Sequence, residues 1–134
     1  MKPETPHNIE QLAAKIGYVF IATADIHGQP HITAAGKLAQ TTEKHMLITE
    51  WFCTQTLSNI EMNPKISVIV WNSMTDFGYQ IIGELEAIKD VGILDGYSPQ
   101  NESKQPVPQV ERQLLFHVDK VLEFKRSSHT DVEE

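Results

Sequence analysis

The sequence predicts a mainly β protein, a six-stranded antiparallel barrel with two or three short helices. Six apolar runs have the length and the alternating or β-branched pattern of strands. Turns rich in Gly, Pro, Asn and Asp separate most of these runs, and strands and helices do not alternate regularly as in a doubly wound sheet. Closing short antiparallel strands into a barrel removes exposed strand edges, which favours a barrel over a sandwich.

Length and composition predict one ordinary globular domain over residues 1–134. The chain is 40% hydrophobic and 22% charged, which is typical of such domains. Its net charge of −7 and its scattered basic residues argue against a nucleic-acid or anionic-membrane partner. The single cysteine, Cys53, excludes an internal disulfide and fits a reducing compartment. No apolar run resembles a secretory signal or a membrane span, so we expect a cytoplasmic protein.

The first part of the chain predicts a helix followed by two strands. Residues 1–6 are expected to be flexible. The helix starts at His7 or Asn8 and ends at Gly17, because apolar residues recur at helical spacing in between: Ile9, Leu12, Ala13 and Ile16. A strand over residues 18–24, a turn at 25–28 and a second strand over 30–38 follow.

The middle of the chain predicts a strand, a polar turn, a short helix and another strand. The third strand covers residues 45–48 and stops at Thr49, and residues 54–56 form the polar turn. A short helix with Leu57 and Ile60 on one face follows, and it ends at Asn63 because proline comes next. The β-branched run 66–71 is the fourth strand.

The last part of the chain predicts two more strands. The fifth strand covers residues 77–87, where Gly83 indicates a bulge or bend. Residues 90–98 are expected to form a short helix or turn, and 98–108 an exposed loop. The final strand falls within 109–124, and the polar residues 127–134 are expected to form a flexible tail.

The start of the middle helix is a candidate phosphate site. The first turn of a helix carries unpaired backbone N–H groups and a partial positive charge. Hydroxyl and amide side chains stand at this place, on Thr54, Gln55 and Thr56. The alternative is that Thr54 or Thr56 serves only as an N-cap.

Two motifs carry a resemblance to a known family. Residues 54–64 resemble the motif S-R-K-x-x-N-L-x-x-N-P of the pyridoxamine 5'-phosphate oxidase-like FMN-binding split barrels. Residues 17–31 resemble the opening hairpin of that family, with its signature ATxDxxGxPH. The resemblance covers roughly residues 9 to 90. It implies a split barrel of the FMN-binding type, bound FMN, and a homodimer with the flavin at the subunit interface.

The resemblance also implies which residues contact the flavin. The phosphate would be held by Thr54, Gln55, Thr56 and Asn59, although Gln55 and Thr56 replace the basic pair of the motif. Lys37 is a candidate replacement cation. The ring would lie along two segments, which are residues Thr33, Ala34, Ala35 and Gly36 and residues Thr49, Glu50, Trp51 and Phe52. It would also touch Gln80 of the other subunit.

Each ring assignment has a structural alternative. The small side chains of residues 33–36 also suit a tightly packed barrel interior. Trp51 and Phe52 could be core or interface residues, and Gln80 could point to solvent. Strand alternation alone does not tell which of residues 33–36 face the ring.

The sequence offers no evident catalytic or metal-binding group. No activating base lies near Cys53 in sequence, and the histidines form none of the usual zinc-ligand spacings. His129, Asp131 and Glu133 fit a flexible polar terminus. We therefore predict neither a catalytic residue nor a metal site in the protein.

The resemblance implies an FMN-dependent oxidoreductase that passes electrons from a nicotinamide or another donor to a small-molecule acceptor. The alternatives are a non-catalytic FMN-binding electron carrier, a barrel that binds haem or a deazaflavin, and a barrel that binds no flavin. Pyridoxamine phosphate oxidation itself is not expected, because the C-terminal residues lack the Arg-rich substrate-phosphate signature.

Overall fold

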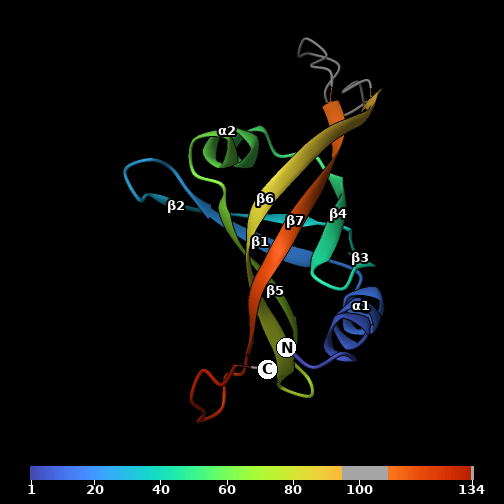
Figure 1. Ribbon diagram of the computed structural model, residues 1–134, viewed down its shortest axis with the longest axis vertical. Coiled ribbons are helices and arrows are strands. Elements are labelled where there is room, and N and C mark those ends of the chain that lie inside the picture. Colours follow the sequence, from blue (N-terminus) through green and yellow to red (C-terminus); the bar gives the residue numbers. More distant parts are fainter. Residues whose placement is uncertain (95–108, 134) are drawn as a thin grey trace.

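The computed structural model describes residues 1–94 and 109–133 and confirms the mainly β fold class. Its strands form one antiparallel sheet in the order β2-β1-β5-β6-β7-β4-β3 (Figure 1). In this view α2 lies in the upper part of the molecule and α1 in the lower part. The elements are α1 (Thr5–Ile16), β1 (Val19–Ala24), β2 (Pro30–Ala35), β3 (Lys37–Thr42), β4 (His45–Trp51), α2 (Thr54–Met62), β5 (Lys65–Asn72), β6 (Phe77–Leu94) and β7 (Gln109–Glu123).

Gly36 joins the two ends of the sheet and closes the barrel. β2 and β3 stand at opposite ends of the strand order, yet only Gly36 separates them along the chain. Its N–H donates to the Glu50 carbonyl oxygen at 3.2 Å, and a Cβ at this position would overlap the Glu50 side chain. The prediction of one strand over residues 30–38 was therefore wrong. The chain changes direction at Gly36, so the described sheet has seven strands rather than six.

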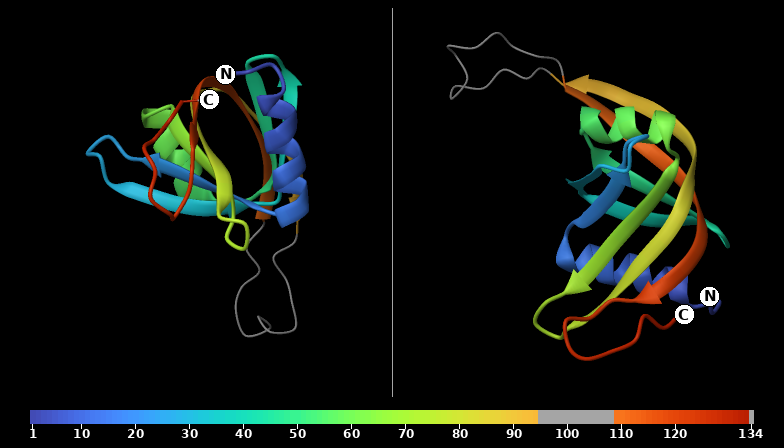
Figure 2. Two further views of the ribbon diagram at one scale, coloured as in Figure 1. Left: turned by 90° about the horizontal axis from the view of Figure 1, so that it is seen from below. Right: turned by 90° about the vertical axis from the view of Figure 1, so that its left-hand side faces the viewer.

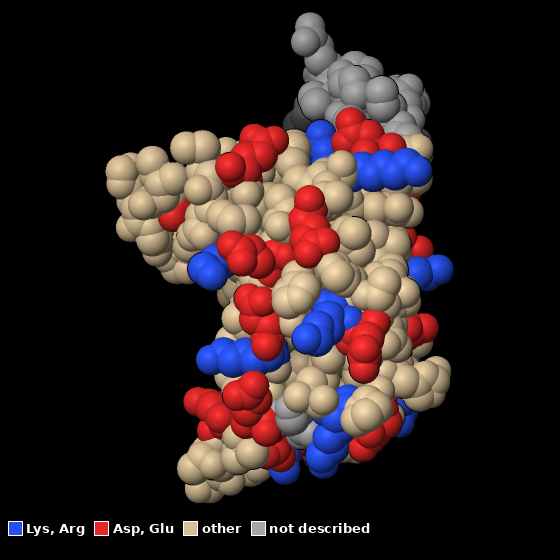
Figure 3. All heavy atoms as spheres, in the orientation of Figure 1, with Lys and Arg blue, Asp and Glu red and all other residues tan. Residues whose placement is uncertain are grey.

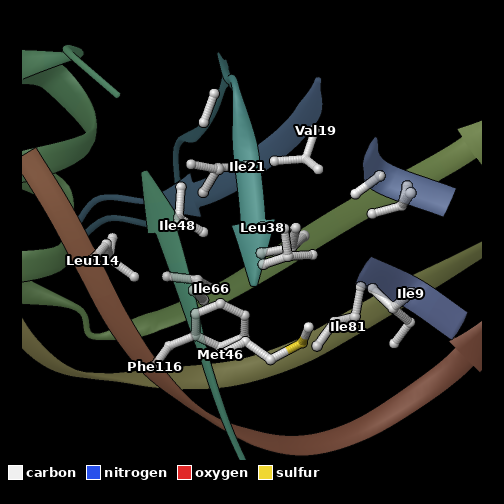
Figure 4. Close-up of a cluster of buried hydrophobic side chains, with 14 of the residues drawn as sticks. Ile9, Val19, Ile21, Leu38, Met46, Ile48, Ile66, Ile81, Leu114 and Phe116 are labelled. Atoms are coloured by element: carbon white, nitrogen blue, oxygen red, sulfur yellow. The ribbon is translucent and has the colours of Figure 1, made fainter. Parts of the chain in front are cut away.

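Alternating apolar residues from most strands fill the barrel interior (Figure 4). Ile21, Ile48, Ile81 and Phe116 are fully buried there. Helix α1 packs on β3 and β5 and buries Ile9. Burial of this apolar surface is the main force that holds the helix on the barrel.

The boundaries of the helices differ from the prediction at their starts. α1 begins at Thr5 rather than at His7 or Asn8, because Pro6 is tolerated in a first helical turn, where its missing N–H has no partner to lose. Thr5 and Pro6 are buried. Residues 54–56 form the first turn of α2 rather than a turn before it, and β4 continues past Thr49 to Trp51. The flexibility of residues 1–6 and 127–134 stays a prediction.

Strand β6 is longer than the sequence indicates. Residues 90–94, predicted to be a helix or turn, continue β6 and pair with β7 as far as Leu94 and Gln109. Cross-strand pairing outweighs the weak local preference of these residues. The predicted bend at Gly83 is confirmed, since the register with β7 shifts between Ile82 and Gly83. Residues 95–98 and the predicted loop 98–108 lie outside the described residues.

The C-terminal residues return to β7, as Figure 2 shows. The Glu123 N–H donates to the Val132 carbonyl oxygen at 2.9 Å, and Glu133 bridges to Leu122. Charges of both signs are interspersed on the face shown in Figure 3. Within the described ranges, the helices are too short and too polar for any of them to span a membrane.

Candidate functional site

Helix α2 starts directly behind β4 with its first turn uncapped. Cys53 occupies the N-cap position in an extended conformation and makes no side-chain cap hydrogen bond. The alternative prediction that Thr54 or Thr56 is the N-cap is therefore wrong. The helix dipole favours negative charge at this end of α2.

Polar contacts tie α2 to β1 and β2. Thr56 is fully buried, and its hydroxyl lies 3.4 Å from Nδ1 of His31 in β2. Asn59 is also buried and donates from Nδ2 to the Thr23 hydroxyl in β1 at 3.1 Å. Its Oδ1 accepts from Nε2 of Gln55 at 3.0 Å. These contacts fix the helix start against the strands, while Thr54 remains exposed.

Cys53 lies in the same polar cluster. Partial burial raises the pKa of the Cys53 thiol, but hydrogen bonds that stabilise the thiolate outweigh it. The strongest of these hydrogen bonds come from the Thr56 hydroxyl and N–H, and weaker ones come from the Thr33 hydroxyl and the Gln55 N–H. The result is a pKa below the ordinary value of a cysteine. The cluster thus stabilises negative charge at the start of α2.

The two predicted ring-binding segments meet at Gly36. The end of β2 and the end of β4 contact each other there. A hollow of about 350 Å³ opens beside this junction, lined by Gly36, Lys37, Thr49, Glu50 and residues of α1 and β3. Lys37 Nζ lies 3.6 Å from Glu50 Oε1, and both side chains are at least half exposed. Glu50 has a positive φ of 57°, which places its backbone in a rarely used conformation.

Strand register separates the faces of residues 33–36. Thr33 pairs with Ile21 and Ala35 with Val19, and those partners are buried in the barrel. Ala34 is exposed on the outer face beside Phe20. Thr33 therefore points to the same side as His31, two residues earlier along β2.

Trp51 belongs to the barrel core. It is fully buried, and its Nε1 has no hydrogen-bond partner among the described residues. Arg112 pairs with Trp51 in the register of β4 and β7, and its buried Nη1 also has no hydrogen-bond partner among the described residues. The Nε of Arg112 forms an ion pair with Asp90 at 3.2 Å. Phe52 is half-buried. Trp51 is therefore a core residue, and its ring has no exposed face on which a flavin could stack.

Gln80 pairs with Ile69 of β5 and therefore shares its outer face of the sheet, where Gln80 Nε2 donates to the Ser67 hydroxyl at 2.9 Å. A hollow of about 650 Å³ opens on this face. Its lining is mainly apolar and includes Tyr18, Phe20, Ile32, Ile69, Trp71 and Phe124. Ile32 is 62% exposed and Tyr18 47%. We call this surface the outer apolar face.

Sequence reasoning missed two features of the site. His31 did not stand out because it fits no ligand spacing, yet its position two residues before Thr33 was a usable signal. The outer apolar face could have been found from β1, where Phe20 and Ala22 alternate with Val19 and Ile21, so that both faces of the strand are apolar. Within the described residues, no cluster of three or more His, Cys, Asp or Glu side chains could hold a metal ion.

Comparisons with known proteins place the chain in a family. The model of the family described as pyridoxamine 5'-phosphate oxidase matches residues 5–122. No curated protein matches the chain.

Solved structures share the fold at low identity. HupZ of Group A Streptococcus has a TM-score of 0.64 and 22% identity, over 92% of this chain and 97% of that one. An FMN-binding protein from Syntrophomonas wolfei has a TM-score of 0.65 and 15% identity, over 95% and 89%. A Clostridium acetobutylicum protein related to general stress protein 26 has a TM-score of 0.66 and 15% identity, over 99% and 96%. Together with the match over residues 5–122, the fold shows that this chain belongs to the pyridoxamine 5'-phosphate oxidase-like family.

Proposed function

We propose that the protein binds FMN, with the phosphate at the start of α2 and the ring beside the Gly36 junction. The observation that carries the proposal is the start of α2, which has no side-chain cap and where the hydroxyls of Thr33 and Thr56 already stabilise negative charge on Cys53. Hydroxyl and backbone N–H donors suit a phosphate group. Family membership and the FMN-binding protein of the same fold support the choice of cofactor.

The residues of the Gly36 junction suit a flat ring. Gly36 has no side chain to hold the ring away from the backbone, and Ala35 and Thr49 flank it in β2 and β4. The hollow there gives access from solvent. Bound FMN would supply electron and hydride transfer, and the protein would bind, orient and shield it. We therefore propose an oxidoreductase that takes electrons from a nicotinamide or another donor, acting in the cytoplasm on a small-molecule acceptor.

A homodimer would complete this site. The outer apolar face is larger and more apolar than scattered surface residues require, which supports a second copy as its partner. Gln80 lies next to Ile69 of this face and is the residue that would reach the flavin of the other subunit.

The first experiment is the absorption spectrum of the purified protein, with the mass of any ligand released by heat and a titration of the apoprotein with FMN. Flavin bands and the mass of FMN would support the proposal. A haem band, a deazaflavin mass, or failure to take up added FMN would each overturn it. Oxidation of NADH or NADPH by the loaded protein separates an oxidoreductase from an electron carrier.

A charge placed in the helix start tests the phosphate position. Thr56→Glu puts a carboxylate against the phosphate, so we expect FMN affinity to fall by at least about a hundredfold, since one buried like charge costs several kcal/mol. Ser58→Glu is the matched control, because Ser58 is exposed on the same helix and should leave affinity unchanged. Circular dichroism checks that both variants keep the fold. Normal FMN binding by Thr56→Glu would contradict the phosphate position.

A further inference from the structure

We propose that Trp51 and Arg112 form a binding site for a small oxyanion, a carboxylate or a phosphate group, at one end of the barrel interior. The inference rests on two buried N–H donors, one of them on a cation, that have no acceptor. It goes beyond the proposed function, because neither residue lines the hollow beside Gly36 in which the flavin ring is proposed to lie.

Both donors are unusual for a folded interior. Trp51 is fully buried, and its Nε1 can only donate a hydrogen bond. Nη1 of Arg112 is equally closed to solvent, and neither nitrogen has an acceptor within the parts of the chain that the structure describes. A buried donor without an acceptor destabilises the folded protein, and a charged one does so more strongly. Two such donors at paired positions therefore indicate a missing acceptor.

The register of β4 and β7 places the two donors next to each other. Trp51 pairs with Arg112, and Ile48 pairs with Leu114. Arg112 and Leu114 are two residues apart in β7 and so point to the same side, and Leu114 is fully buried in the barrel (Figure 4). Directly opposed residues of antiparallel strands have Cβ atoms about 5 Å apart, so one small group can reach both donors.

An irregularity in β4 turns Trp51 toward Arg112. The register shifts between Ile48 and Trp51, because β4 has one more residue there than β7. Simple alternation would place Trp51 on the face opposite Ile48, and the extra residue returns it to the inner face. Glu50, within this bulge, has the positive φ of 57°. The chain thus keeps a strained local conformation that brings the indole N–H beside the guanidinium, and such bulges are common next to functional sites.

The charge of Arg112 favours an anion over a neutral acceptor. Its Nε is paired with Asp90, but the Asp90 side chain is 70% exposed, so solvent screens that carboxylate. A hydrogen bond from a guanidinium to an oxyanion is shorter and stronger than one to a neutral oxygen. The Arg112 side chain is 14% exposed, which gives a ligand a route from solvent. The enclosure of both nitrogens limits the ligand to a small anion.

The test follows the indole N–H of Trp51 by nuclear magnetic resonance. The chain has two tryptophans, and Nε1 of Trp71 already donates to Asp76 at 3.1 Å. The Trp71 signal is therefore an internal reference, and Trp71→Phe assigns the two signals. The purified protein is titrated with sodium acetate and with sodium phosphate at constant pH and ionic strength. Acetamide serves as a neutral probe with nearly the shape of acetate.

We expect a saturating downfield shift of the Trp51 signal with acetate or phosphate and no shift of the Trp71 signal. Acetamide should bind at least about tenfold more weakly than acetate, because hydrogen bonds between charged groups are the stronger ones. The anion that binds more tightly identifies the ligand group as a carboxylate or a phosphate. A Trp51 signal that moves with neither anion, as a buried water on the two donors would produce, would overturn the inference. So would a shift shared by both indoles or an equal response to acetamide.

Arg112→Gln separates the site from the general charge of the surface. It removes the cation and keeps an amide donor, so anion binding should weaken at least about tenfold. Lys89→Gln is the matched control, because Lys89 is an exposed cation on the neighbouring strand β6 and should leave binding unchanged. Circular dichroism checks the fold of both variants. Equal weakening in the two variants would contradict a site at Arg112. The titration needs no flavin, so its result is independent of the proposed FMN function.

Discussion

At the scale of single residues, Gly36 explains why the barrel closes where it does. The residue is needed for close approach rather than for an unusual φ, because a Cβ would meet the side chain of Glu50 across the junction. Its neighbour in space, Glu50, carries the unusual backbone angle. Two adjacent positions of the proposed ring site thus depend on a missing side chain and on a strained backbone.

Gly36→Ala should destabilise the protein by about 1–3 kcal/mol, as overpacking at tight positions does. Urea unfolding measures the change. The double variant Gly36→Ala with Glu50→Gly should recover part of the loss, because it removes the overlapping side chain and relieves the positive φ. A stability of Gly36→Ala equal to that of the natural protein would show that the junction has room for a methyl group.

The sequence was informative about residues wherever the chemistry was local. The motif around Thr54, Thr56 and Asn59 identified the helix that packs on β1 and β2. The sequence did not tell which side of the sheet each residue from Thr33 to Gly36 faces, because that depends on the register of β2 with β1. The ion pair of Lys37 and the contact of His31 with Thr56 also required the fold, because they join residues far apart in the chain.

At the scale of elements, a carboxylate in the turn between β5 and β6 contacts the start of the segment after β7. Asp76 accepts hydrogen bonds from the N–H groups of Arg126 at 2.7 Å and Ser127 at 2.9 Å, and from Nε1 of Trp71 at 3.1 Å. The N–H groups of Arg126 and Ser127, the hydroxyl of Ser127 and the indole of Trp71 together hold the pKa of Asp76 well below its ordinary value. The carboxylate therefore links β5, its turn and the C-terminal segment.

Because the pKa of Asp76 is lowered in the folded state, its contribution is present above the ordinary carboxyl pKa and is lost as the pH falls. Asp76→Asn should mimic that loss at neutral pH. We expect faster hydrogen exchange at the amides of Arg126 and Ser127, with little change in the barrel core. Unchanged exchange at these two amides would contradict the role given to Asp76.

Element boundaries were predictable where a residue type enforces them. Gly17 ends α1 with a φ of 93°, and Pro64 follows the end of α2, as the sequence indicates. The continuation of β6 to Leu94 was not predictable, because its support comes from pairing with β7. The division between β2 and β3 was not predictable either, because the single residue Gly36 is the only local sign of it in the sequence.

At the scale of the whole molecule, the outer apolar face is the feature that a lone barrel does not explain. It spreads over β1, β2 and β5 and reaches the residues after β7. Two aromatic pairs contribute to it, Tyr18 with Phe20 and Trp71 with Phe124. Aromatic side chains are enriched in protein interfaces, which agrees with the proposed homodimer.

Ile32→Asp should weaken a homodimer at least about tenfold, because it places an unpaired charge in an apolar interface. Analytical ultracentrifugation over a range of concentrations measures the effect. Met62→Asp is the matched control, since Met62 is 65% exposed but lies on α2, away from the outer apolar face. A natural protein that sediments as a monomer at all concentrations would contradict the proposed dimer.

The order of strands in the sheet also determines how the chain must fold. β1 with β2, β3 with β4 and β5 with β6 are local hairpins, which form in microseconds. The ladders of β1 with β5 and β4 with β7 join distant parts of the chain; His45, for example, pairs with His117. Such long-range pairing is slow, because loop entropy is lost before the contacts form. The hairpins β1–β2 and β3–β4, which Gly36 joins, can therefore assemble early. They reach their final positions only when β5, β6 and β7 connect them.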